Sequence, residues 1–206
     1  MSHLSLLVYA LFVLVSFHAN RRVTADFTPQ EEEQIERFQL YLRIRTAHPD
    51  PDYAAAAAFL LAEARSIGLR AVALKFVPGK PVILLSWPGS DTSLPSILLN
   101  SHIDSVPAEP SRWLHPPFAA VRDAAGRIFA RGAQDDKCIA VQYLEALRKL
   151  KDSGFTPLRS IHVSLVPDEE IGGADGAAKF SASEQFVELN VGFCSGRGAS
   201  IAHRRV

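Results

Sequence analysis

The sequence predicts an α/β fold in which helices cover a largely parallel, mixed sheet. Helical patterns alternate with strand-like runs along the chain, which is typical of this class. Residues 82–87 and 96–100 are almost continuously apolar, as expected for strands buried on both faces. Acidic and imidazole groups follow several of these runs, where open α/β sheets collect their ligands.

The composition bounds what the chain can be. Its 206 residues suffice for one good-sized domain, and 48% of them are hydrophobic, which is enough for a core. The formal net charge of zero offers no basic field, so we expect no nucleic-acid partner. The two cysteines, Cys138 and Cys194, make no disulfide framework.

The N-terminus carries an apolar run over residues 4–17, the length of a signal-peptide core. Small residues at 23 and 25 predict cleavage after Ala25, so residues 1–25 are expected to be a secretory signal. An uncleaved signal anchor is the alternative, because no Lys or Arg precedes the run. If the signal is used, we expect the protein in the endoplasmic reticulum, a vacuole or outside the cell.

Four segments are predicted to be helical. Thr28, Pro29 and Glu31 form a capping box with proline in the first turn, which predicts a helix start. An alanine-rich helix is expected over 53–67, ended by Gly68. The other two helices are expected over 135–151 and 176–180.

Strands are predicted between the helices. Alternating or continuous apolar patterns indicate strands over 70–77, 82–87, 96–100, 159–166 and 186–193. A short hairpin is expected around 127–130, after Gly126.

Three polar clusters lie at the ends of apolar runs. The first contains His102 and Asp104, the second Asp135 and Asp136, and the third the pair Glu169 and Glu170. Singly, each has a structural explanation: a surface loop, carboxylates favoured by a helix dipole, or an acidic solvent-facing turn. Together they form a donor set suited to a divalent metal, best matched by zinc.

These clusters resemble the motifs of the M20 metallopeptidase and amidohydrolase family, and within it the aminoacylases. The similar stretches are NSHIDSVP at 100–107, FARGAQD at 129–135 and VPDEEIGG at 166–173. The resemblance covers residues 27–193. It implies a three-layer α/β/α sandwich of the zinc-peptidase type, incomplete in this chain.

The resemblance also implies a role for each residue. His102 would bind one zinc ion, Asp135 would bridge two, and Glu170 would bind the other, giving two zinc ions per complete site. Glu169 would be the general base and then the general acid, and Asp104 would orient His102. The implied reaction converts a small-molecule N-acyl-L-amino acid to a carboxylate and a free L-amino acid. Asp136 departs from the aminoacylase pattern, which usually has Met there.

The pattern ends at residue 193. We therefore expect residues 26–193 to be the N-terminal part of an M20 catalytic domain, and residues 194–206 to be an aberrant tail from a shifted reading frame. The lid or dimerisation domain, through which the family forms homodimers, is expected to be absent, and hydrolysis to be impaired. The alternatives are an M20 dipeptidase or carboxypeptidase, or a non-catalytic fragment. Without a used signal, the resemblance implies the cytoplasm.

Overall fold

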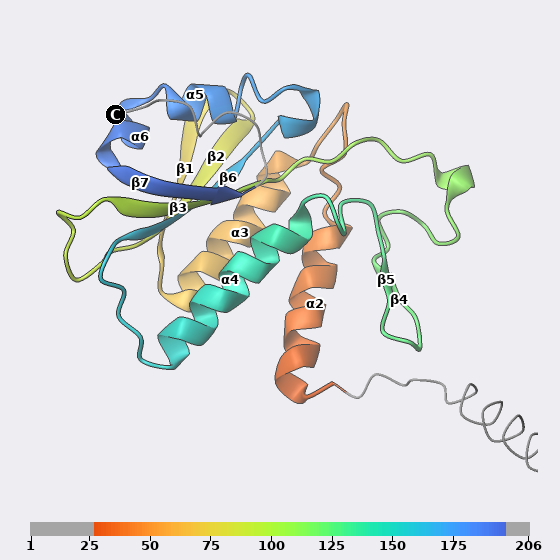
Figure 1. Ribbon diagram of the computed structural model, residues 1–206. Helices are drawn as coiled ribbons and strands as arrows, with labels where there is room; N and C mark the ends of the chain where they lie inside the picture. Colours follow the sequence, from red (N-terminus) through yellow and green to blue (C-terminus); the bar gives the residue numbers. More distant parts are fainter. Residues whose placement is uncertain (1–26, 197–206) are drawn as a thin grey trace, which may run out of the picture.

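The computed structural model describes residues 27–196 (Figure 1). The expected signal segment, residues 1–25, and residues 197–206 of the expected tail lie outside the described residues. Within 27–196, none of the helices combines the length and apolar character needed to span a membrane.

A five-stranded sheet forms the centre of the fold, which confirms the predicted α/β class (Figure 1). Its strands run in the order β1 (Arg70–Val77), β2 (Lys80–Trp87), β6 (Ile161–Val166), β3 (Ser96–His102) and β7 (Val191–Gly196). The β1–β2 and β2–β6 pairs are antiparallel, whereas β3 is parallel to both β6 and β7. The sheet is therefore mixed, and its parallel part is the β6–β3–β7 ladder.

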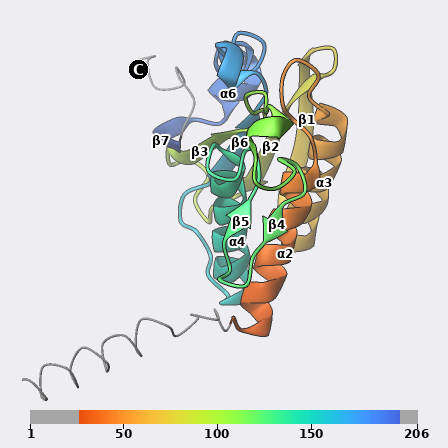
Figure 2. The same cartoon turned by 90° about the vertical axis from the view of Figure 1, so that its right-hand side faces the viewer.

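Helices cover both faces of this sheet and complete three layers (Figures 1 and 2). One face carries α3 (Tyr53–Ile67) and α4 (Lys137–Asp152), with α2 (Pro29–Arg43) packed against α4. The other face carries the short helices α5 (Ala177–Ser181) and α6 (Glu184–Glu188). The remaining elements are a hairpin, β4 (Val121–Arg122) and β5 (Ile128–Phe129), and two 3-10 turns, η1 (Pro110–Arg112) and η2 (Glu169–Ile171).

The helix boundaries follow from capping chemistry. Thr28 caps α2 in the predicted capping box, in which the Glu31 carboxylate accepts from the Thr28 amide at 2.8 Å. Asp52 caps α3, and Gly68 ends it in the left-handed conformation at φ 75°. Helix α4 begins at Lys137, two residues later than predicted, because Asp136 occupies the N-cap position.

One predicted strand, 186–193, is wrong over its first half. Ser183 caps a helical turn by accepting from the Phe186 amide at 3.2 Å, so residues 184–188 form α6. Phe186 and Leu189 pack against Phe180 of α5. The apolar run therefore belongs to a helix packed on the sheet, and β7 starts only at Val191.

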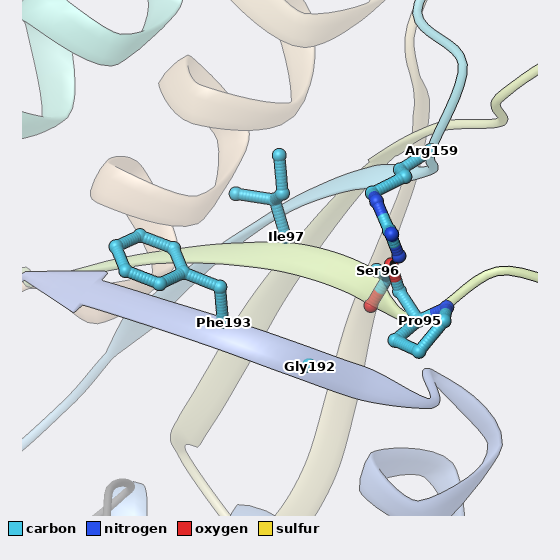
Figure 3. A pocket seen from close by; sticks show the side chains of 6 residues that line it. All are labelled: Pro95, Ser96, Ile97, Arg159, Gly192 and Phe193. Atoms are coloured by element: carbon cyan, nitrogen blue, oxygen red, sulfur yellow. Dashed lines mark hydrogen bonds between the residues drawn. The ribbon is translucent and has the colours of Figure 1, made fainter.

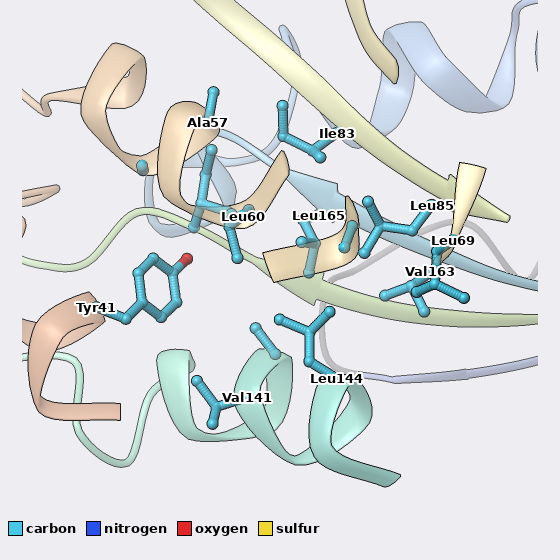
Figure 4. Packing of buried hydrophobic residues seen from close by; sticks show 14 of the residues in the cluster. Tyr41, Ala57, Leu60, Leu69, Ile83, Leu85, Val141, Leu144, Val163 and Leu165 are labelled. Atoms are coloured by element: carbon cyan, nitrogen blue, oxygen red, sulfur yellow. The ribbon is translucent and has the colours of Figure 1, made fainter. Parts of the chain in front are cut away.

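The main core lies between the sheet and the helices α3 and α4 (Figure 4). Its buried residues include Leu60, Ile83, Leu144, Val163 and Leu165. Because side chains alternate along a strand, residues 162, 164 and 166 of β6 face the opposite layer, that of α5 and α6. This packing fixes β3 and β6 side by side and so sets where their ends lie.

Candidate metal centre

The parallel register of β3 and β6 brings two of the polar clusters together. His102, the last residue of β3, pairs with Val166, the last residue of β6. The Ile103 amide continues the ladder by donating to the Val166 carbonyl at 2.9 Å. The residues that follow both strands, Asp104 on one and Glu169 on the other, therefore leave the sheet at the same edge.

His102 is the centre of this edge and is 1% exposed. Its Nδ1 lies 3.1 Å from the Asp104 carbonyl oxygen and 3.3 Å from Asp104 Oδ1. Its Nε2 lies 2.9 Å from Asp135 Oδ1, at the residue pair that precedes α4. Segments more than 30 residues apart in sequence thus meet on the two nitrogens of one imidazole.

Both ring nitrogens of His102 lie beside hydrogen-bond acceptors. A proton or a cation is therefore needed between His102 and Asp135. The proton on Nδ1 serves Asp104, so Nε2 and the Asp135 oxygen need a second proton or a metal ion between them. Burial opposes the charged ring, but the hydrogen bonds of Asp104 and Asp135 and the charges of Asp104 and Asp136 outweigh it and raise the pKa of His102 to about 9. This arrangement fits a divalent cation.

Asp136 adds a buried carboxylate to the same edge. Its Oδ2 accepts from Ser101 Oγ at 2.8 Å, whereas its Oδ1 is buried and has no hydrogen-bond partner among the described residues. Burial raises the pKa of Asp136. Ligand atoms of His102, Asp135 and Asp136 all lie within 4.8 Å of one another, a spacing compatible with one shared ion. An unsatisfied anionic oxygen beside them is a further reason that a cation fits.

Asp104 joins the imidazole to the acidic turn. Its Oδ1 accepts from the Glu169 amide at 3.1 Å and its Oδ2 from the Glu170 amide at 3.0 Å. Its Oδ2 also contacts His48 Nε2 at 2.9 Å. Burial alone would raise the pKa of Asp104, but hydrogen bonds from His102 and His48 outweigh it, so the net pKa is lowered. Asp104 is therefore a fully buried carboxylate that orients both His102 and the turn.

The two carboxylates of the acidic turn η2 differ in how they relate to the site. Glu169 Oε2 lies 3.8 Å from His102 Nε2. Burial raises the pKa of Glu170, and the charges of Asp135, Asp104 and Glu169 raise it further, against the opposing effect of His102. Glu170 is not part of the 4.8 Å group among the described residues. Its ligand role stays a prediction.

Sequence reasoning missed one contributor to this edge, His48. Asp136 was part of the predicted donor set, although the resemblance assigned it no role, and its carboxylate belongs to the 4.8 Å group. His48 carried no site prediction, yet it reaches Asp104 across 56 positions, next to a bridge between Ala47 and Ser105. No local signal in the sequence connects positions 48 and 104.

A cavity of about 400 Å³ adjoins the candidate metal centre. Its lining combines the apolar side chains of Trp113, Ile128 and Phe129 with polar surface, and it reaches Asp135. The Arg131 guanidinium also lines it, 5.2 Å from the Trp113 ring centroid, and donates to the Pro107 carbonyl at 3.1 Å. The cavity thus offers apolar surface and one cation beside the metal candidates.

A second cavity, of about 300 Å³, lies at the other end of β3 (Figure 3). It is lined by Pro95, Ser96, Ile97, Arg159, Gly192 and Phe193. The Arg159 guanidinium donates to the Pro95 carbonyl at 2.8 Å. No carboxylate, imidazole or thiol is among these lining residues, so this cavity lacks the groups that acid–base or metal chemistry requires.

Comparison with known proteins supplies a family for this fold and site. Residues 98–200 match the family described as peptidase family M20/M25/M40. This stretch contains all the predicted site residues, from His102 to Glu170.

Curated relatives are similar over most of this chain. Aminoacylase-1 of Sus scrofa is 48% identical over 168 residues, which are 82% of this chain and 41% of that protein. A probable carboxypeptidase S-like 2 of Dictyostelium discoideum is 40% identical over 111 residues, 53% of this chain and 21% of that protein. The chain spans about two fifths of the length of the aminoacylases that it matches.

Solved structures share the fold at low sequence identity. The M20 family metallo-carboxypeptidase Sso-CP2 from Sulfolobus solfataricus superposes with a TM-score of 0.69 at 22% identity. The match covers 81% of this chain and 37% of that one. The superposition agrees with the α/β architecture described above.

Proposed function

Because this chain belongs to peptidase family M20/M25/M40, a family of metal-dependent hydrolases, we propose that it hydrolyses N-acyl-L-amino acids. The products are a carboxylate and a free L-amino acid. The substrate class is supported by 48% identity to an aminoacylase-1 over 82% of the chain. The observation that carries the chemistry is the meeting of His102, Asp135 and the Glu169 turn at one edge of the sheet.

We propose zinc as the metal, held by His102, Asp135 and Glu170, with Asp136 as a further candidate donor. One imidazole and several carboxylates suit zinc. Bound there, zinc would supply a Lewis acid for the amide carbonyl and for a water molecule. Such a donor set would hold two ions, and Asp135 is the donor that both would share.

The protein's own groups move the proton. Glu169 takes a proton from the attacking water and then delivers it to the departing amide nitrogen, so that a free amine leaves. Its carboxylate is near enough for this role, since Oε2 lies 3.8 Å from His102 Nε2. The Glu169 side chain is 28% exposed, so water can reach it. Asp104 keeps the His102 proton on Nδ1, which leaves Nε2 available as a ligand.

The cavity beside Asp135 supports an amino-acid derivative as substrate. Trp113 and Phe129 offer apolar surface for an acyl group or side chain, and Arg131 offers a cation for the free carboxylate. N-acyl amino acids carry both an apolar group and a free carboxylate. An Arg–carboxylate pair would orient the substrate as well as add affinity.

The test is a zinc-dependent assay on the 206-residue chain. After chelation and addition of zinc, we expect slow release of free methionine from N-acetyl-L-methionine, lost in Glu169→Gln while zinc is retained. Glu184→Gln, on the exposed helix α6, is the matched control and should keep the wild-type rate. A chain that binds zinc but releases no methionine above the metal-free level would contradict the proposal and favour a non-catalytic role.

A carboxypeptidase or dipeptidase activity is the second candidate, favoured by the similarity to a probable carboxypeptidase S-like protein. The same assay distinguishes the two when a dipeptide such as Ala-Leu replaces the N-acetylated substrate. Faster hydrolysis of the dipeptide would favour this second candidate.

A further inference from the structure

Asp168 sits at the junction between β6 and the acidic turn η2. It is 2% exposed and adopts the left-handed conformation, at φ 63° and ψ 22°. Residues other than glycine avoid this region unless surrounding contacts hold them there. The residue that directly precedes Glu169 is therefore held in a disfavoured conformation.

Two residues from distant elements hold Asp168 in place. The Tyr53 hydroxyl, at the start of α3, donates to Asp168 Oδ1 at 2.7 Å and accepts from the Asp168 amide at 3.1 Å. Lys80 Nζ, at the start of β2, lies 2.5 Å from Asp168 Oδ2 and 2.7 Å from Asp175 Oδ2. Both oxygens and the amide of Asp168 are thus engaged from outside the turn.

Hydrogen bonds also fix the two residues that follow Asp168. The amides of Glu169 and Glu170 bond to the two oxygens of Asp104, which also contacts His102. The Asp168 carbonyl closes the turn by accepting from the Gly173 amide at 2.7 Å. Three consecutive residues are consequently fixed, the first by Tyr53 and Lys80 and the other two by Asp104.

We propose that Tyr53 and Lys80 are positioning residues that act through Asp168 to aim the Glu169 and Glu170 carboxylates at the metal centre. The role rests on the proposed function, because it is Glu169 that moves the proton there. The left-handed Asp168 turns the chain sharply after β6, so that Glu169 and Glu170 meet Asp104. Without the contacts from Tyr53 and Lys80, the turn relaxes and the Glu169 and Glu170 carboxylates lose their fixed direction.

The first test uses the metal-free chain and needs no turnover. Amide hydrogen exchange at Glu169 and Glu170 is measured by NMR in the wild type and in Tyr53→Phe, which deletes only the hydroxyl. We expect protection of both amides to fall about tenfold, since each turn bond depends on the next. Tyr41→Phe is the matched control, because its buried hydroxyl has no hydrogen-bond partner among the described residues. Equal protection in both variants would overturn the proposal, whatever the hydrolase assay gives.

The second test separates positioning from folding. With zinc bound, Tyr53→Phe and Lys80→Met should lower kcat about tenfold and leave KM for N-acetyl-L-methionine unchanged. Asp168→Asn should resemble Lys80→Met, since asparagine tolerates the left-handed conformation and still accepts from the Tyr53 hydroxyl but turns an NH2 group toward Lys80. If the variants instead raised KM and lowered thermal stability without changing kcat, the role of these residues would be purely structural. If no variant, wild type included, turns over substrate, the exchange experiment alone decides.

Discussion

The two ends of the parallel β3–β6 pair have similar structural features but different chemistry. Each end has a cavity, an arginine and a buried histidine. At the C-terminal end, His102 contacts Asp104 and Asp135. Nearer the N-terminal end, His162 pairs across the sheet with Ser86, whose Oγ lies 2.8 Å from His162 Nδ1.

The difference teaches that burial alone does not make a histidine functional. Burial lowers the pKa of His162, and no charged partner within residues 27–196 opposes it. At His102, the same desolvation is outweighed by carboxylates, and the pKa rises to about 9. His162 is therefore a neutral hydrogen-bonding residue of the core, whereas His102 sits where a positive charge is required.

The largest contrast between the two ends is expected from Asp104→Ala. The change leaves His48 and the amides of Glu169 and Glu170 without their acceptor in a fully buried site. We expect a loss of about 3–5 kcal/mol in the free energy of unfolding, measured by urea denaturation. Asp91→Ala, at the other end of the sheet, removes a local contact to Ser93 and should cost less than about 1 kcal/mol. Similar losses in the free energy of unfolding for Asp104→Ala and Asp91→Ala would contradict the difference between the two ends.

The next effect concerns zinc and the two histidines. His102→Gln removes a proposed ligand, so zinc affinity, measured by competition with a chelator, should fall beyond the ~10–100-fold typical of losing a supporting group. His162→Gln keeps a polar side chain beside Ser86 and should leave zinc affinity unchanged. If the two variants lost zinc equally, the metal centre would not lie at the His102 end.

A smaller effect should distinguish the two cavities. Arg131→Gln removes the cation beside Trp113, and we expect KM for N-acetyl-L-methionine to rise about tenfold with little change in kcat. Arg159→Gln makes the same change in the cavity at the other end, where it should not affect KM. A rise in KM for Arg159→Gln alone would move the substrate to that cavity.

The smallest effect is a pH dependence at His162. Because its folded-state pKa lies below the unfolded value of about 6.5, the unfolded chain binds the proton more readily. Stability should therefore fall as the pH decreases below about 6.5, by at most about 1.4 kcal/mol per pH unit from this group. His162→Gln should lose less stability between pH 7 and pH 5.5, measured by urea denaturation at each pH. Identical pH profiles would show that His162 does not titrate differently on folding.

The sequence by itself determined the local elements. Capping at Thr28, the helix end at Gly68 and the apolar runs of β2 and β3 depend on near neighbours, so they can be read along the chain. The same short-range reading failed at 186–193, where packing of Phe186 on Phe180 favoured a helix over the strand that its apolar pattern suggested.

Only the tertiary structure decided the surroundings of the site. The motifs identified His102, Asp104, Asp135, Glu169 and Glu170. The parallel register of β3 and β6 placed the residues after these strands at one edge, and the segment before α4 brought Asp135 to His102. His48, Tyr53 and Lys80 reach that edge from 56, 115 and 88 positions away, in contacts that no local pattern encodes. The physical reason is that hydrogen bonds between distant residues form only after the core has packed α3 and β2 beside β6.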